Sequence, residues 1–356
     1  MGALILWVIA LLISFYLLNE VTDRFFVPSL DKIAQKWNMS DDAAGATLMA
    51  AGSSAPEIFI AIIALIYGGD NFEIGVGTIV GSALFNLLVI IGAVGLVKTS
   101  VISWRPMSRD IFFYIISIAL LYWAYSSGSI TMLHVGIFVG VYILYVIVVI
   151  LWKKILPSKD DNLDVEEDLD EEDPSWKKYF RLLDYILEKI FAKPKYYGIN
   201  FLISVALIAL LSWVLVESAV VISAAMGVPK YIIALTVLAF GTSVPDMMSS
   251  IIVARQGRGG MAISNALGSN IFDILIGLGI PWMVLIFMRD LDIQVNSENI
   301  AHHILVLLGS VIAMLAVFLL SRWRINRVIG SLMILSYLSY LVYVGYEVYH
   351  AGAIIH

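Results

Sequence analysis

The stretches AAGSSAPE at residues 50–57 and AFGTSVPD at residues 239–246 decide how this chain folds. Both fit the pattern A-x-G-[ST]-S-x-P-[ED], and each lies inside an apolar run long enough to cross a membrane. An acidic side chain near the centre of a bilayer costs about 3 kcal/mol or more unless it faces protein, water or a bound cation. Two such acids in matched settings therefore predict a cation site built by an internal repeat.

The composition indicates a membrane protein. Of the 356 residues, 60% are hydrophobic and only 14% are charged, whereas about a quarter of the residues are charged in a typical soluble protein. Apolar stretches of helix-spanning length recur along the whole chain, and the alternating ten-residue segments of a membrane β-barrel are absent. There is no cysteine, which excludes disulfides, thiol nucleophiles and Cys-ligated metals.

Ten apolar stretches predict ten membrane-spanning helices. The first has no basic residue before it and is too long for the apolar part of a signal peptide. Twenty of the 22 Lys and Arg residues then fall on one side of the membrane, and only Lys230 and Arg289 fall on the other. By the positive-inside rule, both termini are expected outside the cell, extracellular or periplasmic, with the central linker in the cytoplasm. The spans are expected at residues 3–26, 42–67, 73–97, 108–126, 130–152, 199–225, 230–255, 259–287, 300–321 and 328–349.

An odd number of spans in each half inverts the second half relative to the first. Residues 1–152 hold five spans, residues 199–356 hold the other five, and residues 153–198 join them. The two motifs then run antiparallel, related by an axis in the membrane plane, and Glu57 and Asp246 are expected to meet near the midplane. The predicted fold is an all-α membrane protein with ten transmembrane helices in two inverted-topology five-helix repeats.

The predicted cytoplasmic linker has two parts. Residues 160–173 contain ten acidic residues, which is typical of a solvated, disordered segment. A calcium-sensing loop is the alternative, although the EF-hand pattern fails because Gly is missing from its sixth position. Residues 176–193 place apolar side chains on one helical face, and this predicts either an amphipathic helix on the cytoplasmic surface or a plain extension of span six.

Each motif offers a set of hard oxygen ligands. Pro56 and Pro245 lack an N–H, so the carbonyl groups of Gly52 and Gly241, four residues earlier, lose their helical donors and the turn opens. Freed carbonyls, Ser or Thr hydroxyls and a carboxylate suit Ca²⁺, which prefers roughly six to eight oxygens in irregular geometry. Na⁺ is also a hard ion and accepts the same atoms. A proline-kinked packing helix with a stray acid is the alternative for either motif alone, but it does not account for a matched pair.

A second repeated element follows each motif, GSALFN at residues 81–86 and GSNIFD at residues 268–273. Ser82 and Asn86 are four residues apart and share a helix face, as do the Ser and Asp of the second copy. Four helices are therefore expected to converge, with both motif acids, Asn86 and Asp273 pointing inward. For Ser82 and Asn86, packing between small residues is the alternative explanation.

These stretches resemble the cation/calcium exchanger superfamily, and most of all the potassium-dependent sodium/calcium exchangers. The resemblance covers most of both repeats, at residues 43–92 and 232–282, and extends to FVPSL at residues 26–30. It implies ten helices and alternating access. It also implies a central Ca²⁺ site that uses the carboxylates of Glu57 and Asp246 and the backbone oxygens of Ser53 and Thr242.

The same resemblance implies sodium sites beside the Ca²⁺ site. Asp273 matches the potassium-dependent members and is the expected K⁺ ligand. The short central loop departs from the long-loop eukaryotic members and resembles a compact prokaryotic-type exchanger. The family's sodium positions map onto Ala50, Ser54, Ser82, Ala239, Ser243 and Ser269, with Asn86 and Asp273 as the middle polar pair.

The sequence thus predicts a secondary active antiporter, and not an enzyme, that exchanges Na⁺ for Ca²⁺ with K⁺ co-transported. A Ca²⁺/H⁺ exchanger of the same fold is the alternative, although polar side sites would be superfluous for protons. A cation channel is a further alternative, and it would show flux without sodium dependence. An intramembrane protease would need a His or a second Asp pair at membrane depth, which the sequence lacks. We expect the lipid bilayer and inorganic cations as partners, no resident cofactor, no nucleic acid, and a monomer to be sufficient.

Overall fold

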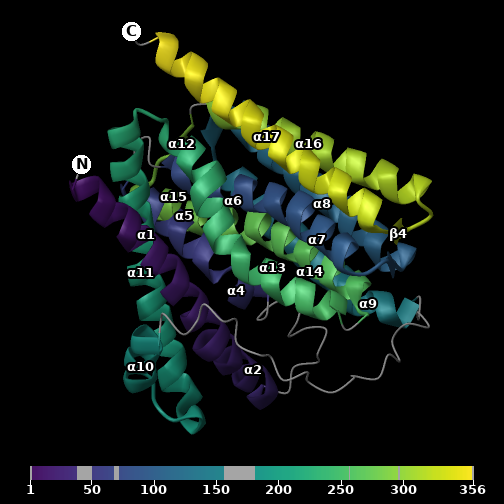
Figure 1. Ribbon diagram of the computed structural model, residues 1–356, viewed down its shortest axis with the longest axis horizontal. Coiled ribbons are helices and arrows are strands. Elements are labelled where there is room, and N and C mark those ends of the chain that lie inside the picture. Colours follow the sequence, from purple (N-terminus) through teal and green to yellow (C-terminus); the bar gives the residue numbers. More distant parts are fainter. Residues whose placement is uncertain are drawn as a thin grey trace.

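The computed structural model describes residues 2–37, 50–67, 72–155, 181–255, 257–295 and 297–354. Almost all of this part of the chain is helical (Figure 1). Segments labelled η are π-helical, except η7, which is a 3₁₀ turn. In chain order the elements are α1 Gly2–Val21, η1 Thr22–Phe26, α2 Val27–Lys36, α4 Ala50–Ser53, α5 Ala55–Tyr67, α6 Phe72–Phe85, η4 Asn86–Ile90, α7 Ile91–Val97, β1 Ser100–Val101, α8 Trp104–Ser126, β2 Ser129–Ile130, α9 Met132–Ile155, α10 Arg181–Ile190, η7 Pro194–Tyr196, α11 Tyr197–Met226, α12 Lys230–Ile233, η8 Ala234–Leu238, α13 Ala239–Arg255, α14 Gly259–Phe272, η9 Asp273–Leu278, α15 Gly279–Arg289, β3 Ile293–Gln294, α16 Ser297–Leu320, β4 Arg324–Ile325 and α17 Arg327–Ile354.

The ten predicted spans correspond to ten helical stretches. Eight are apolar helices long enough to cross a membrane, and a ninth is a helix bent by 53° between Val244 and Asp246. The tenth is α4–α5, which contains the short apolar helix Ala55–Tyr67. The first eight residues predicted for this span, 42–49, lie outside the described residues. The first span ends at Leu30 rather than at residue 26, and its helix continues through α2 to Lys36.

Two short strand pairs establish the inversion of the halves. β1, between spans three and four, pairs antiparallel with β4, between spans nine and ten. β2, between spans four and five, pairs with β3, between spans eight and nine. When the spans are counted within each half, the link between the third and fourth spans of one half thus lies beside the link between the fourth and fifth spans of the other half. Equivalent links therefore occupy opposite ends of the bundle, as inverted repeats require. Strands of two residues leave no periodic pattern, and the sequence did not predict them.

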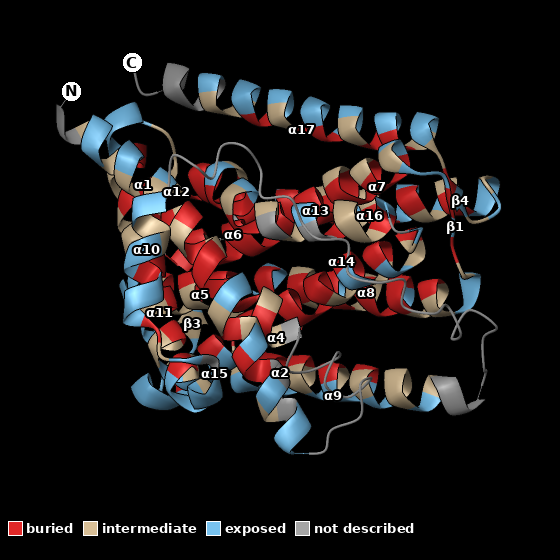
Figure 2. Ribbon diagram, turned by 60° about the horizontal axis from the view of Figure 1, so that its bottom comes forward, coloured by how far each residue is buried: buried red, intermediate tan, exposed pale blue. Residues whose placement is uncertain are grey.

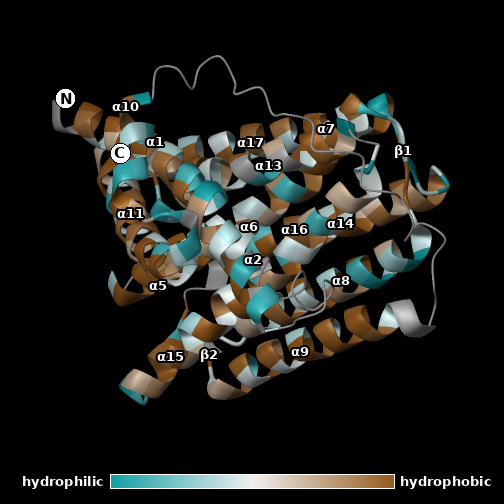
Figure 3. Cartoon of the chain, turned by 90° about the horizontal axis from the view of Figure 1, so that it is seen from below, coloured by the Kyte–Doolittle hydropathy of each residue, from teal (hydrophilic) through white to brown (hydrophobic). Residues whose placement is uncertain are grey.

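The helices that carry the second repeated element form the centre of the bundle. α6–η4–α7 and α14–η9–α15 are buried over most of their length, and Figure 2 shows buried residues concentrated there. α9, α16 and α17 instead expose much of their surface, and Figure 3 shows hydrophobic residues along these outer helices. An apolar exterior around a buried centre that carries polar residues is the arrangement expected for a protein whose solvent is lipid.

The first spans of the two halves, α1 and α11, pack against each other on one flank of the molecule (Figure 1). Their side chains, including Leu11, Leu18, Leu215 and Val216, belong to a hydrophobic cluster separate from the larger central one. This second cluster reaches the centre through residues of α5, η8 and neighbouring turns, such as Ile60. The α1–α11 pair is thus an apolar layer laid against the core.

The predicted amphipathic helix is present as α10, whereas the ten acidic residues at 160–173 lie outside the described residues. The alternative, a plain extension of span six, is wrong. Lys193 precedes a proline and has an extended backbone, which ends the helical run before α11 begins at Tyr197. α10 is tied to α1 and η1, because Asp184 accepts a 2.6 Å hydrogen bond from Tyr16 and Arg24 donates one of 2.7 Å to Glu188.

Candidate cation-binding site

The first motif helix is interrupted, and the second is bent, next to the motif proline. α4 ends at Ser53 and α5 begins at Ala55, so that Ser54 forms a turn between them. In the second motif the helix axis bends by 53° between Val244 and Asp246. A break in the first motif and a bend in the second agree with the expected effect of proline at these positions.

Glu57 stands in the first turn of α5, and its side chain is only 2% exposed. Ser82 donates a long hydrogen bond of 3.5 Å to its Oε1, and the Thr242 hydroxyl faces the same carboxyl group. Its Oε2 has no hydrogen-bond partner among the described residues. Asp246 is close enough to feel the negative charge of Glu57. The two motif acids therefore come together as predicted, with an oxygen left available to a cation.

Hydroxyl groups join the two halves on either side of Glu57. The Ser82 and Ser243 hydroxyl oxygens are 2.8 Å apart, and those of Ser54 and Ser269 are 3.2 Å apart. All four side chains are buried. Each pair connects the motif serine of one half with the second-element serine of the other half. The four serines that the resemblance predicts as sodium ligands are thus brought together in two symmetry-related pairs.

Asp273 lies at the start of η9 and Asn86 at the start of η4, the equivalent π-helical segment of the other half. Such π-helical turns are frequent at functional sites. Asp273 is 2% exposed, faces the hydroxyls of Ser54 and Ser269, and feels the charge of Glu57. Its Oδ1 and the Oδ1 of Asn86 have no partner in the described part of the chain. Both members of the predicted middle pair therefore offer an unused oxygen.

The orientation of the Asn86 amide is fixed by Asn270, which the sequence analysis did not single out. Asn270 donates from Nδ2 to the carbonyl oxygen of Ala83 (3.2 Å) and to the Tyr114 hydroxyl (3.0 Å). Its Oδ1 must then be the acceptor for the Asn86 Nδ2, at 2.9 Å. Because a backbone carbonyl can only accept, this chain of contacts leaves the Asn86 Oδ1 facing away from Asn270. The signal in the sequence is Asn270 itself, which replaces the alanine of the first copy.

The remaining predicted positions lie around this centre. Ala239 is fully buried, and its carbonyl, like that of Leu238, accepts a hydrogen bond from the Thr242 hydroxyl. Ala50 begins α4, but its side chain lies outside the described residues. Ser53 borders a cavity together with Asp246. No contact in the described structure tests whether the backbone oxygens of Ser53 and Thr242 act as ligands.

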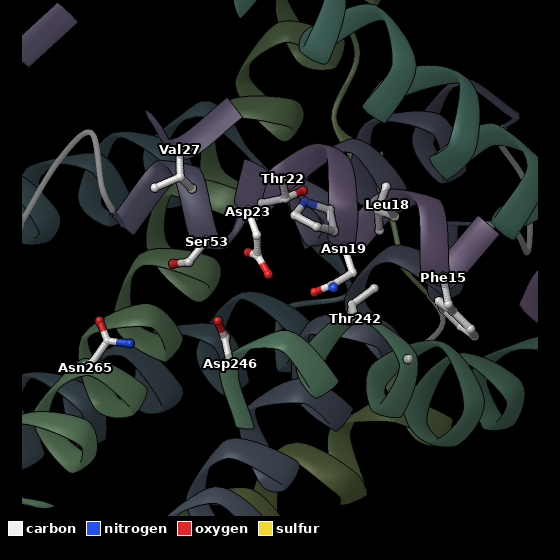
Figure 4. Close-up of a pocket in the computed structure, with 12 residues that line it drawn as sticks. Phe15, Leu18, Asn19, Thr22, Asp23, Val27, Ser53, Thr242, Asp246 and Asn265 are labelled. Carbon is white, nitrogen blue, oxygen red and sulfur yellow. The ribbon is translucent and has the colours of Figure 1, made fainter. Parts of the chain in front are cut away.

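A cavity of about 270 Å³ adjoins the site between η1, the two motifs and α14. Figure 4 shows Asp246 pointing into it from α13 and Asp23 pointing into it from η1. Asp246 lines this cavity and is half-buried, in contrast with the buried Glu57 and Asp273. The sequence analysis did not single out the helix-one residues that line it.

The donor set is mixed. Among the described residues, no group of three or more His, Cys, Asp or Glu side chains is arranged to hold a metal ion by itself. The site instead combines carboxylate, hydroxyl and amide oxygens, without sulfur or imidazole. Such donors fit the hard cations Ca²⁺ and Na⁺ and do not fit soft metals.

Sequence comparisons identify relatives over nearly the whole chain. The profile described as sodium/calcium exchanger protein matches residues 7–151 and 197–346. The chain is 30% identical to sodium/potassium/calcium exchanger 5 of Homo sapiens, with 95% of this chain and 82% of that protein aligned. It is 27% identical to sodium/potassium/calcium exchanger 4 of Mus musculus, over 94% of this chain and 80% of the relative.

Solved structures share the fold. The H⁺/Ca²⁺ exchanger CAX superposes with a TM-score of 0.71 at 12% identity, over 98% of this chain and 86% of that one. The sodium-calcium exchanger NCX_Mj superposes with a TM-score of 0.55 at 23% identity, over 95% and 99% of the two chains. These likenesses support the fold alone. The profile match covers most of both halves and includes both acidic motifs, and so this chain belongs to the sodium/calcium exchanger protein family.

Proposed function

We propose that this protein is a secondary antiporter that moves Ca²⁺ in exchange for Na⁺, with K⁺ co-transported. The observation that carries the proposal is the convergence of Glu57 and Asp246, from inverted halves, at a buried centre where the Glu57 Oε2 lacks a partner among the described residues. The relatives in sequence are named sodium/potassium/calcium exchangers, and their names supply the identity of the ions.

Charge balance makes the exchange concrete. Glu57, Asp246 and Asp273 together carry three negative charges when ionised. One Ca²⁺ with one K⁺ neutralises them, and so do three Na⁺, while a fourth Na⁺ would make transport electrogenic. An unneutralised acid cluster is expensive in an apolar interior. Only a neutralised site is therefore free to pass between the two access states, and competition between the ion sets couples their opposing fluxes.

The proposed ligands are those that the family resemblance implies. Ca²⁺ is held by the carboxylates of Glu57 and Asp246 and by the backbone oxygens of Ser53 and Thr242. Asp273, with its unpartnered Oδ1, is the proposed K⁺ ligand. The proposed Na⁺ positions flank the Ca²⁺ site, and the two interhalf serine contacts support them. These positions are Ala50, Ser54, Ser82, Asn86, Ala239, Ser243, Ser269 and Asp273.

Alternating access is proposed to come from movement of α1 and α11 against the central helices. The ring of Phe15 in α1 packs directly on Gly241, where a Cβ would clash with the ring in its present position. A shift of α1 would therefore reshape the second motif. The hydrophobic cluster shared by α1 and α11 is separate from the central one, which supports movement of the two helices as a unit. Sliding of packed helices is a common means of domain closure.

The proposed orientation places both termini outside and the linker, residues 153–198, in the cytoplasm between the repeats 1–152 and 199–356. The cavity then opens to the cytoplasm. Asp246 of α13 and Asn265 of α14 line it. The turn that joins these two helices follows Arg255 and contains Arg258, and the positive-inside rule places such a basic turn in the cytoplasm. The arrangement supports an inward-facing state.

Proton exchange is less well supported. The likeness to the H⁺/Ca²⁺ exchanger rests on fold at 12% identity, whereas the likeness to sodium/potassium/calcium exchangers rests on sequence over more than 90% of the chain. The four paired serines and Asn86 also give sodium-type ligands that proton exchange would not require.

The test is ⁴⁵Ca²⁺ uptake into sodium-loaded proteoliposomes that contain wild-type protein, Glu57→Gln or Asp246→Asn. Each substitution removes one charge with little change in shape, and each should abolish sodium-dependent uptake. Asp292→Asn is the control, because this acid is exposed in the link before β3. Uptake like that of the wild type by either site variant would refute the site assignment.

A further inference from the structure

The cavity beside the motif acids has a second polar wall, made by η1 and the end of α1. Asn19, Thr22 and Asp23 line it opposite Asp246 (Figure 4). None of the three belongs to the repeated motifs. Their role is therefore not explained by the symmetric site described above.

Two oxygens of this wall have no hydrogen-bond partner in the described part of the chain. Thr22 lines the cavity, is only 4% exposed, and its Oγ1 has no partner among the residues that the structure describes. The same holds for the buried Oδ1 of Asn19, and Figure 4 shows the Asn19 side chain directed toward the space between Asp23 and Asp246. Buried polar groups in folded proteins are nearly always paired, so two unused oxygens on one cavity wall indicate a ligand that binds oxygen, such as a hydrated cation.

Two acids face each other across the same space. Figure 4 shows the carboxyl groups of Asp23 and Asp246 directed toward one another from η1 and α13. Asp246 feels the negative charge of Asp23 in addition to that of Glu57. Like charges held together raise the energy of the site, and a cation between them reverses the sign of this interaction.

The polar wall also breaks the internal repeat. When Glu20 of α1 is matched with Glu217 of α11, the residues equivalent to the wall are apolar. In the second half Val216, Ala219 and Val220 stand where the first half has Asn19, Thr22 and Asp23. Inverted repeats alone would give both faces of the membrane the same approach to the site. The difference indicates a function needed on one face only.

We propose that Asp23 and Asp246, with the side-chain oxygens of Asn19 and Thr22, form a second Ca²⁺ site in the cavity, outside the central one. The cavity, about 270 Å³ in volume, has room for several waters at roughly 30 Å³ each, so the ion is bound here with part of its hydration shell. It loses those waters when it passes inward to Glu57. The site exists only on the face of the membrane to which the cavity opens, and so it raises Ca²⁺ affinity on that face only. The identity of the bound ion as Ca²⁺ rests on the proposed function.

Equilibrium binding of ⁴⁵Ca²⁺ to the purified full-length protein tests the site directly. Wild-type protein should bind two Ca²⁺, one tightly and one weakly. Asp23→Asn should lose the weak component, and Glu57→Gln should lose the tight component and keep the weak one. Glu217→Gln is the matched control, because Glu217 is the repeat counterpart of Glu20 and accepts a 2.7 Å hydrogen bond from Tyr67; it should bind two. Two unchanged components in Asp23→Asn overturn the proposal.

Transport from each face separates this site from the central one. In inside-out membrane vesicles, which present the cavity side, Asp23→Asn should raise the KM for Ca²⁺ by about 3- to 10-fold, because affinity follows the number of charged ligands. In right-side-out vesicles the KM should stay at the wild-type value, and Asp23→Glu should restore it in both. An unchanged KM on the cavity side, or an equal rise on both sides, contradicts the proposal. The proposed function itself fails by a separate result, Ca²⁺ uptake by the wild-type protein that does not depend on Na⁺.

Thr22→Val provides a second variant of nearly the same shape, should Asp23→Asn not purify as a monodisperse protein. If the hydroxyl is a ligand, the KM on the cavity side rises. If the hydroxyl is only an unpaired buried group, its removal raises the melting temperature and leaves the KM unchanged, which contradicts its place in the site.

Discussion

The hydroxyl oxygens of Ser54 and Ser269 lie 3.2 Å apart, and their contact crosses from one half of the protein to the other. Its counterpart under the inverted repeat is the 2.8 Å contact between Ser243 and Ser82. One pair faces Asp273, and a member of the other pair donates to Glu57. Glu57 and Asp273 are therefore each approached by hydroxyl groups from both halves, and neither half contains a complete site.

Removal of one of these hydroxyls should weaken sodium binding more than calcium binding. In Ser82→Ala, the contacts to Ser243 and to Glu57 are both lost. We expect the half-saturating Na⁺ concentration to rise by about 3- to 10-fold, the effect of roughly 1 kcal/mol from one buried hydrogen-bonding group. The measurement is Ca²⁺ release from proteoliposomes as external Na⁺ is varied.

Ser336→Ala is the control for this substitution, because Ser336 is on an outer helix and donates to a carbonyl of its own helix. Its Na⁺ dependence should match the wild type. A Ser82→Ala protein with the same Na⁺ dependence as the control would remove Ser82 from the sodium site.

Asp273→Asn should abolish the stimulation of exchange by K⁺. The substitution keeps the size of the side chain, but it leaves only two negative charges at the centre, which one Ca²⁺ neutralises without K⁺. Calcium uptake should therefore persist and become independent of K⁺. The measurement is initial ⁴⁵Ca²⁺ uptake with K⁺ or choline present. A K⁺ response like that of the wild type would show that another residue binds K⁺.

Asn270 should behave as a positioning residue for Asn86. In Asn270→Leu, the Asn86 amide loses the acceptor that fixes its orientation, and the Ala83 carbonyl loses a donor. We expect the free energy of unfolding to fall by about 1–3 kcal/mol and the Na⁺ requirement to rise. Thermal unfolding and Na⁺-dependent flux measure the two effects.

The Tyr114→Phe variant separates these effects, because it removes one contact to Asn270 and leaves the Asn86–Asn270 hydrogen bond in place. It should lose about 1 kcal/mol of stability and retain its Na⁺ dependence. An Asn270→Leu protein with unchanged Na⁺ dependence would limit Asn270 to a structural role.

Gly81→Ala should destabilise the centre of the bundle. A Cβ at this position would clash with the Leu235 carbonyl oxygen, a backbone atom that cannot rotate away. Overpacking of this kind costs about 1–3 kcal/mol. Gly140→Ala in α9 is the matched control, since a Cβ there has no atom within 4 Å, and alanine should stabilise that helix by up to about 1 kcal/mol. Equal melting temperatures for the two variants would show that α6 and η8 are less closely packed than described.

The sequence predicts the membrane spans and the convergence of the motif acids well, because these depend on long apolar runs and on a repeat that both halves display. The resemblance supplies the serine positions, and the contacts Ser54–Ser269 and Ser82–Ser243 agree with it. The continuation of the first helix through α2 to Lys36 was missed, since α2 has few apolar residues and carries Pro28 in its first turn, where proline is tolerated.

The rest of the site depends on contacts between distant segments, which periodicity does not reveal. Tyr114 reaches Asn270 from α8 across 156 positions, and Asp23 faces Asp246 from the other half of the chain. In hindsight, asymmetry is the available signal. Asn270 and Asp23 stand where the other copy has alanine or valine, and a polar residue that breaks a repeat at membrane depth needs its own explanation.

The most direct test of the account is ⁴⁵Ca²⁺ flux through purified wild-type protein in proteoliposomes, with the Na⁺, K⁺ and pH gradients imposed one at a time. An outward Na⁺ gradient should drive Ca²⁺ uptake, K⁺ on the Ca²⁺ side should increase it, and a pH gradient alone should drive none. Uptake that follows the pH gradient and ignores Na⁺ would contradict sodium/calcium exchange.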